Sequence, residues 1–252
     1  FSLFIGGICY SQTSTVGLIS YDDKVYDGYT VLSSHHSTTT YLIDNCGFIV
    51  HTWESEYFPG NTVRLMNNGD LLRATKVNAI SFLAGGAGGR IEILNWDGSI
   101  KWEFEYSTDE YRHHHDVEEL PNGNILLLAW DGRAKDEAIA AGRNPESLGA
   151  VNQDVWGEHL LEIKPLDNNE YEIVWEWYLW DHLVQDYDDT KDNYGVVKDH
   201  PELVNINYTT NPTNPDWIHA NGISYSEALD QIIISAHSLN EFWVIDHSGT
   251  TE

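Results

Sequence analysis

Short runs of alternating apolar and polar residues, separated by tight turns, recur along the whole chain. The segments 63–74 (VRLMNNGDLLRA) and 117–129 (VEELPNGNILLLA) each read as a strand, an Asn-Gly turn and a second strand. An Asn-Gly pair between two such runs is a strong β-hairpin signal. A looser copy, NGISYSEALDQIIISA, covers residues 221–236. These hairpins predict an all-β chain.

A second kind of hairpin alternates with the first along the chain. Its copies are residues 41–54, 92–106 and 161–179, and a tryptophan closes the second strand of each: Trp53, Trp102 and Trp175. Two hairpins make a four-stranded unit, and repeated four-stranded units are typical of the blades of a β-propeller. The pattern predicts about three and a half blades. A β-sandwich is the alternative architecture, and the Trp-ended repeats favour the propeller.

Two insertions interrupt the later units. Residues 135–149 (KDEAIAAGRNPESLG) predict a short helix, and residues 181–215 predict an acidic, Asn-rich loop. The fourth unit starts at about Asp216 and lacks the final Trp-bearing strand of the earlier units. We therefore expect the chain to be a piece of a longer protein.

The first residues, FSLFIGGIC, are apolar or small and are followed by YSQ. This pattern predicts that residues 1–11 are the remnant of a secretory signal peptide and that residues 12–252 form the propeller domain. A first buried strand is the alternative. Removal of the segment would leave Cys46 without a disulfide partner. We expect a periplasmic or secreted protein.

The charge of the chain narrows its possible partners. Its 252 residues include 40 acidic and 13 basic ones, for a formal net charge of −27. Nucleic acids and anionic membrane surfaces both require clustered Lys and Arg, so neither is expected as a partner. No later stretch is apolar enough for membrane insertion. The negative potential of the whole chain repels anions, so an anion could be bound only in a pocket where hydrogen-bond donors or positive groups are concentrated.

Polar residues gather at four predicted strand starts or ends. They are the run from His113 to Asp116, the pair His219 and Asn221, His237, and the pair His35 and His36. The innermost strand of each blade lines the central channel of a propeller, so imidazole and amide groups would converge there. Strand alternation predicts that His219 and Asn221 share one face, that His113 and His115 share one, and that adjacent histidines point to opposite faces.

Several other chemistries fit the sequence less well. A zinc site built from His115, His219 and His237 would need three strands that are distant in sequence to place their imidazoles around one ion. Residues 186–193 resemble a calcium loop but lack its glycine and its final glutamate. The Gly-rich stretch 84–93 has no Lys-Ser/Thr and predicts a turn or a channel-side loop. We predict no metal and no cofactor. What remains is anion chemistry by histidine, as nucleophile, base or donor.

Four long motifs, in order along the chain, resemble the bacterial arylsulfate sulfotransferases. They are HHDVEELPNGNILLLAW, WEWYLWDHLVQDYDDTKDNYGVVKDHPELVNINY, DWIHANGISY and LDQIIISAHSLNEFWVIDHSGTTE. The similarity runs from about Val16 to Glu252. It implies a six-bladed propeller in the complete protein, exported from the cytoplasm. It also implies sulfuryl transfer from a phenolic sulfate ester to a phenol through a sulfohistidine, without a nucleotide sulfate donor.

The resemblance also implies roles for individual residues. The family's HHD motif falls on His114, His115 and Asp116, with His115 favoured over His114 as the channel residue, and its HxN motif falls on His219 and Asn221. A family arginine aligns with His237, which is only a conditional cation. We therefore assign catalytic roles to His115, His219 and His237, and substrate-binding roles to His114 and Asn221.

The resemblance places the sulfuryl-accepting histidine beyond Glu252, so this chain alone is expected to be inactive. The expected partners are a small aryl sulfate donor and a phenol acceptor. A non-catalytic propeller that binds a sulfated or phenolic ligand or a glycan is the first alternative function. A metal-dependent propeller hydrolase is the second.

Overall fold

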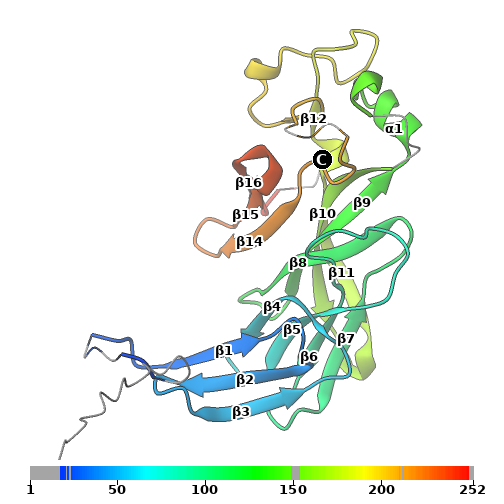
Figure 1. The fold of residues 1–252 in the computed structure, drawn as a ribbon. Helices are drawn as coiled ribbons and strands as arrows, with labels where there is room; N and C mark the ends of the chain where they lie inside the picture. Colours follow the sequence, from blue (N-terminus) through cyan, green and yellow to red (C-terminus); the bar gives the residue numbers. More distant parts are fainter. Residues whose placement is uncertain are drawn as a thin grey trace, which may run out of the picture.

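The computed structural model describes residues 18–20, 22, 24–148, 154–209, 211 and 213–249, and these are almost entirely β. Four antiparallel sheets, here called blades 1 to 4, succeed one another along the molecule (Figure 1). Blade 1 contains β1 (Tyr29–Ser33), β2 (Thr39–Asp44) and β3 (Ile49–Glu54). Blade 2 contains β4 (Pro59–Leu65), β5 (Leu71–Lys76), β6 (Gly89–Leu94) and β7 (Ile100–Glu105). Blade 3 contains β8 (Tyr111–Glu119), β9 (Ile125–Arg133), β10 (Val155–Pro165) and β11 (Tyr171–Tyr178), and blade 4 contains β14 (Ala220–Ser226), β15 (Gln231–Ala236) and β16 (Glu241–Asp246).

The blades confirm the predicted all-β class and the partial propeller. Over the described residues, two blades have four strands and two have three, which together amount to three and a half four-stranded units. The segment 1–11, predicted as a signal-peptide remnant, lies outside the described residues.

The predicted Asn-Gly turns join the first two strands of blades 2 and 3. Gly69 and Gly123 have φ values of 90° and 84°. This left-handed region is open to glycine at no steric cost, which explains why each turn ends on that residue. The turns therefore fix the β4–β5 and β8–β9 hairpins from local sequence.

Strand β9 shows how the blades stack on one another. Leu126 and Leu128 belong to the core shared with blade 4, whereas Leu127 and Ala129 belong to the core shared with blade 2. All four are fully buried. Successive strand residues point to opposite faces, so a continuous apolar run is what a strand needs when both of its faces are covered.

Two of the three tryptophans that close the blades, Trp53 and Trp102, join neighbouring blades by hydrogen bonds that are here called clasps. Trp53, in β3, donates its indole N–H to the carbonyl oxygen of Asn95 in the turn of blade 2 at 3.2 Å. Trp102, in β7, donates in the same way to Glu170 in the turn of blade 3 at 2.9 Å. Each clasp joins the last strand of one blade to the outer turn of the next.

The insertions lie at the upper end of the molecule in Figure 1. The predicted helix is α1 (Lys135–Ala140), followed by the 3-10 turn η1 (Pro145–Leu148). The predicted loop 181–215 also holds a short parallel pair, β12 (Leu183–Val184) and β13 (Val204–Asn205). The other 3-10 turns are η2 (Asp167–Asn169), η3 (Leu179–Asp181), η4 (Val197–Asp199) and η5 (His237–Leu239). Among the described residues, no helix has the length and apolar character needed to cross a membrane.

Candidate functional site

The innermost strands of blades 2, 3 and 4 lie together, with β8 in contact with both β4 and β14. Each of the three carries a bulge opposite its partner strand. The register shifts fall between Pro59 and Val63 in β4, between His113 and Val117 in β8, and between Ala220 and Ile223 in β14. A bulge interrupts the alternation of side chains and re-aims the residues inside it. The HHD motif therefore lies in a bulge and not in a regular strand.

Two of the predicted histidines have an unusual backbone. The φ angle is 51° at both His115 and His219. A residue other than glycine in this left-handed region costs about 1–3 kcal/mol, and such residues cluster at functional sites. The peptide N–H of His115 donates to the carbonyl of Gly86 at 2.8 Å, which helps to hold the strained position.

The bulge brings His114 and His115 together. Their Nδ1 atoms are 2.9 Å apart, so one ring donates a hydrogen bond to the other. The expectation that adjacent histidines point to opposite faces was wrong, because it assumed a regular strand. His113 does not join them: it is fully buried, and its Nδ1 accepts a hydrogen bond from the N–H of Gly89 at 3.3 Å.

A buried glutamate lies behind the pair. Glu158, in β10, places Oε2 3.0 Å from Nε2 of His114, and its Oε1 accepts the N–H of Ala220 at 2.8 Å. Both His114 and Glu158 are 0% exposed. The His114 ring also stacks on Trp130 at a centroid distance of 4.0 Å. His114 thus uses both ring nitrogens and one face inside the protein, and only His115 of the pair is partly exposed.

Asp216 and His219 form a second carboxylate–histidine pair, beside the pair of Glu158 and His114. Oδ2 of Asp216 is 2.5 Å from Nδ1 of His219, and Oδ1 of Asp216 accepts the indole N–H of Trp130 at 3.2 Å. The His115 and His219 rings meet edge to face with centroids 4.8 Å apart. His237, exposed at the start of η5, extends the row with its ring 5.5 Å from that of His219. Trp130 supports both pairs at once.

The pKa values of the histidines in the cluster are shifted in opposite directions. Burial, reinforced by the neighbouring histidines, lowers the pKa of His115 to about 3. Burial also lowers the pKa of His114 to about 3 and raises the pKa of Glu158 well above its usual range. In contrast, the hydrogen bond that His219 donates to the Asp216 carboxylate raises the pKa of His219. At neutral pH, the site therefore presents a neutral imidazole at His115 next to His219, an imidazole whose pKa is raised.

Asp116, the last residue of the HHD motif, ties the three inner strands together. Its Oδ1 accepts the hydroxyl of Thr62 at 2.8 Å and lies 3.3 Å from the guanidinium of Arg64, both in β4. Its Oδ2 accepts the N–H of Ile223, in β14, at 3.0 Å. Asp116 is thus an anchor of the site and not a group aimed at a ligand.

The Gly-rich stretch forms a channel-side loop, one of the two predicted possibilities. Ala87 pairs with His114 as an isolated antiparallel bridge. A Cβ on Gly86 would lie 2.0 Å from Cε1 of His115, and one on Gly88 would lie 2.6 Å from Nδ1 of His113. The glycines leave room for the imidazoles.

The remaining predicted residues lie farther from this cluster. Asn221 is exposed within the bulge of β14 and has no hydrogen bond to any residue that the structure describes. The bulge also removes the basis for expecting it to share a face with His219. His35 and His36 are exposed after β1. Of the five predicted site residues, the structure brings together His114, His115, His219 and His237.

Three residues of the site were missed by the sequence interpretation: Trp130, Glu158 and Asp216. A glutamate inside the apolar run VWGEHLLEI was a usable signal, because a carboxyl group is rarely buried without a specific partner. No comparable local signal marks Trp130, whose role depends on contacts with two other strands.

Metal binding finds no ready-made arrangement in the described part of the chain. No three His, Cys, Asp or Glu side chains there are placed to hold a metal ion. In particular, His115, His219 and His237 form a row of ring contacts and not a chelating triad.

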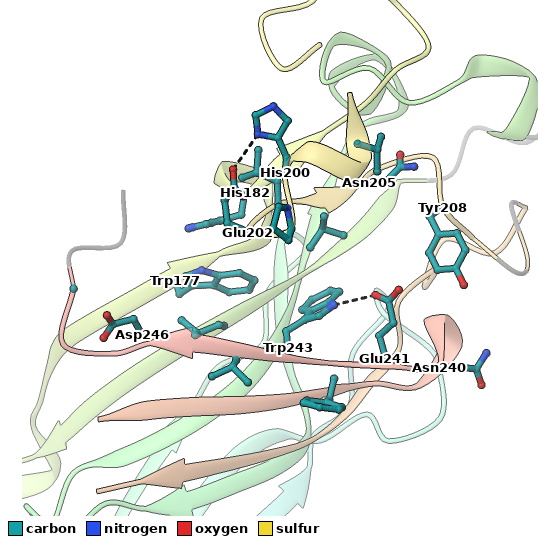
Figure 2. A pocket seen from close by; sticks show the side chains of 18 of the residues that line it. Trp177, His182, His200, Glu202, Asn205, Tyr208, Asn240, Glu241, Trp243 and Asp246 are labelled. Atoms are coloured by element: carbon teal, nitrogen blue, oxygen red, sulfur yellow. Dashed lines mark hydrogen bonds and ion pairs between the residues drawn. The ribbon is translucent and has the colours of Figure 1, made fainter. Parts of the chain in front are cut away.

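A groove of about 1210 Å³ lies elsewhere, between β11, β16 and the loop around η4 (Figure 2). Trp177 and Trp243 face it with ring centroids 6.5 Å apart. Its polar groups pair with one another: the Nδ1 atom of His200 lies 3.0 Å from Glu202, and the indole of Trp243 donates to Glu241 at 3.3 Å. None of the four histidines of the cluster lines this groove.

Comparison with known proteins gives a family and little more. No curated protein matches the chain. Among solved structures, a protein of unknown function from Bacteroides caccae is 10% identical with a TM-score of 0.41, and the match covers 89% of this chain and 60% of that one. A luciferin-regenerating enzyme is 12% identical with a TM-score of 0.35, and the match covers 87% of this chain and 55% of that one. The chain thus spans less than two thirds of either structure, and neither likeness is close enough to carry an argument.

The family model for arylsulfotransferase (ASST), in contrast, matches residues 15–251. This range includes every member of the histidine cluster. The chain belongs to the arylsulfotransferase family.

Proposed function

We propose that the cluster belongs to a site that transfers a sulfuryl group from an aryl sulfate ester to a phenol, through a histidine intermediate. Family membership supports the general activity. The observation that carries the proposal is the opposite pKa shift of His115 and His219, whose rings are only 4.8 Å apart. Neighbouring titratable groups with pKa values pushed apart are the usual mark of an acid–base site.

His219 is the group that holds the sulfate oxygens. Asp216 occupies its Nδ1 and favours the protonated ring, which leaves Nε2–H free of any described partner. In its protonated form, His219 is a cationic donor that can stabilise the negative charge of a sulfate ester as the sulfur is attacked. His237, exposed at the end of the same row, would add to the binding of the oxygens, and the family resemblance implies the same role for Asn221.

His115 is the acid and then the base. Its Nδ1 is bonded to His114, and Nε2 has no described partner. In the first half-reaction, a histidine nitrogen attacks sulfur, the sulfur–oxygen bond to the donor breaks, and the leaving phenolate takes the proton of His115 Nε2–H. In the second half-reaction, the acceptor phenol returns a proton to His115 Nε2, its oxygen bonds to sulfur, and the nitrogen–sulfur bond breaks. We place the attacking histidine beyond Glu252, as the family resemblance implies, and assign that role to no residue of this chain.

The test uses the complete protein and a chromogenic aryl sulfate, without acceptor. We expect one phenol released per site and a sulfuryl adduct on a histidine, mapped by mass spectrometry and lost when a phenol is added. His219→Ala should abolish the adduct, and His35→Ala, an exposed histidine outside the cluster, should not.

Other outcomes would replace the proposal. Binding of the aryl sulfate without release of phenol would indicate the non-catalytic propeller. Release that requires a metal and leaves no adduct would indicate the metal-dependent hydrolase.

We also propose that the complete protein is exported. The proposal rests on the family resemblance and on the apolar or small residues 1–9. Fractionation of cells that make the complete protein tests it, and recovery with the cytoplasmic fraction would contradict it.

A further inference from the structure

The proposed acid–base role leaves a chemical difficulty at His115. A ring with a pKa of about 3 is almost never an imidazolium at neutral pH, so it cannot donate a proton in the ordinary way. A neutral imidazole can give up its only N–H without becoming an anion if its other nitrogen gains a proton at the same time. That proton must come from a group bonded to Nδ1.

The group bonded to Nδ1 is His114, and the group bonded to His114 is Glu158. The two contacts are 2.9 Å between the Nδ1 atoms and 3.0 Å between Nε2 of His114 and Oε2 of Glu158. We infer that Glu158, His114 and His115 form a proton relay in which Glu158 is the terminal store of the proton that His115 exchanges with the phenols. The inference rests on the proposed function for its substrate and on the geometry alone for the relay.

The relay has two states, because each neutral ring carries one N–H. With a proton on Glu158, Oε2–H donates to His114 Nε2, His114 Nδ1–H donates to His115 Nδ1, and His115 presents Nε2–H. With Glu158 ionised, both hydrogen bonds reverse direction: His114 Nε2–H donates to Glu158, and His115 Nδ1–H donates to His114. His115 then presents a lone pair at Nε2. Protonation at Glu158 and donor character at His115 Nε2 are thus linked.

Transfer through the relay balances in both half-reactions. When the leaving phenolate takes the proton from His115 Nε2, one proton moves from His114 to His115 and another from Glu158 to His114, and Glu158 becomes a carboxylate. The acceptor phenol reverses every step. No imidazolium forms at His114 or His115, which agrees with their burial.

The surroundings of the relay favour this arrangement. Glu158 is fully buried, and burial raises its pKa, so a stored proton is stable there. The N–H of Ala220 fixes Oε1, and Trp130 fixes the plane of His114 by stacking. The charged or titratable neighbours are Asp216 and His219, which act on Glu158, His114 and His115, and Asp116, which acts on His115. His113 also lies beside the two histidines, as a fully buried group with a lowered pKa.

The variant Glu158→Gln distinguishes a role of Glu158 in the relay from a purely structural role. The glutamine can accept the N–H of Ala220 and donate to His114 Nε2, so it copies the protonated state and cannot leave it. The complete protein is labelled with ¹⁵N-histidine and studied without substrate by NMR, which reads the tautomer of each ring. In the unmodified protein, we expect His115 to change from the Nε2–H to the Nδ1–H tautomer as pH rises and Glu158 ionises. In Glu158→Gln, it should remain Nε2–H throughout.

Single-turnover adduct formation supplies the catalytic readout. An ester of a nitrophenol, a good leaving group, needs little protonation, whereas an ester of a simple phenol, with a pKa of about 10, needs it. Glu158→Gln should change the first rate by less than about threefold and reduce the second by about a hundredfold or more. Glu162→Gln, a buried glutamate in the same strand and outside the relay, is the matched control.

Each result bears on the relay. Equal loss with both esters would overturn it in favour of a structural role, as would a His115 tautomer that does not change with pH in the unmodified protein. The titration of the unmodified protein needs no variant, so it decides the matter even if Glu158→Gln fails to fold. If the unmodified protein forms no sulfuryl adduct, the proposed function fails, and the NMR result still stands for or against the relay.

Discussion

Gly86 carries no side chain at the one point of its loop where a side chain would collide with His115. Its φ angle of 82° is also one that other residues rarely adopt. Gly85, the preceding residue, has open space at the position of a Cβ. The two glycines therefore have different reasons to be present, although the sequence AGGAGG does not distinguish them.

Gly86→Ala should displace the His115 ring and reduce sulfuryl transfer by the complete protein at least about tenfold, equivalent to about 1.4 kcal/mol in the barrier. The left-handed backbone adds about 1–2 kcal/mol of destabilisation. Steady-state rates and thermal unfolding measure the two effects. Gly85→Ala should alter neither, and equal behaviour of the two variants would contradict the packing argument.

The charge of His219 depends on Asp216. In Asp216→Asn, we expect the pKa of His219 to fall, because the hydrogen-bonded carboxylate that raises it is gone. A raised folded-state pKa contributes stability that is full below the unfolded value of about 6.5 and is lost as pH rises through the folded value. The difference in unfolding free energy between the two proteins should thus be largest at acid pH. NMR titration of His219 gives the pKa directly, and Asp97→Asn, in an exposed turn, should leave it unchanged.

His115 and His219 could be predicted from sequence because imidazoles in successive repeats point to a shared channel. Their contacts could not be predicted. The pairing of His114 with His115 depends on a bulge whose extra residues leave no local signature. Likewise, Glu158 reaches His114 from two strands away, so only the register of blade 3 brings the two together.

At the scale of elements, the predicted hairpins and turns were confirmed because their signals are local. The short parallel pair β12–β13 was missed, since each of its strands has two residues and they meet across the loop of residues 185–203. The bulges of the three inner strands were missed because their extra residues leave no local signature in the sequence. They bring polar groups together where a regular strand would alternate them.

Blade 2 contains a buried network of ion pairs that could not be predicted from the sequence. Glu92, in β6, lies 2.8 Å from the guanidinium of Arg73 and 3.0 Å from that of Arg90, and all three are buried. Glu92→Gln leaves two buried cations without their shared carboxylate and should cost about 3–5 kcal/mol in the free energy of unfolding. Denaturant titration measures the loss. The exposed pair of Lys164 and Glu172 is the control, because Glu172→Gln should cost less than about 1 kcal/mol.

At the scale of the whole molecule, the net charge of −27 makes the folded chain repel itself. Raising NaCl from about 0.05 M to about 0.5 M shortens the Debye length and should raise Tm by roughly 2–4 °C. The same increase near pH 4.5, the isoelectric point of the sequence, should have little effect. A fall in Tm with salt at neutral pH would mean that favourable ion pairs outweigh the repulsion. Thermal unfolding followed by circular dichroism gives the answer.

The tryptophan clasps also bear on how such a molecule could have arisen. Each of blades 1 and 2 ends in an indole donor, and each of blades 2 and 3 offers a turn carbonyl to the blade before it. A duplicated blade gene segment would therefore encode both halves of the joint from the start. Lengthening by tandem duplication would need no new interface to evolve, and each copy would then be free to diverge on its inner strand, where the histidine cluster lies.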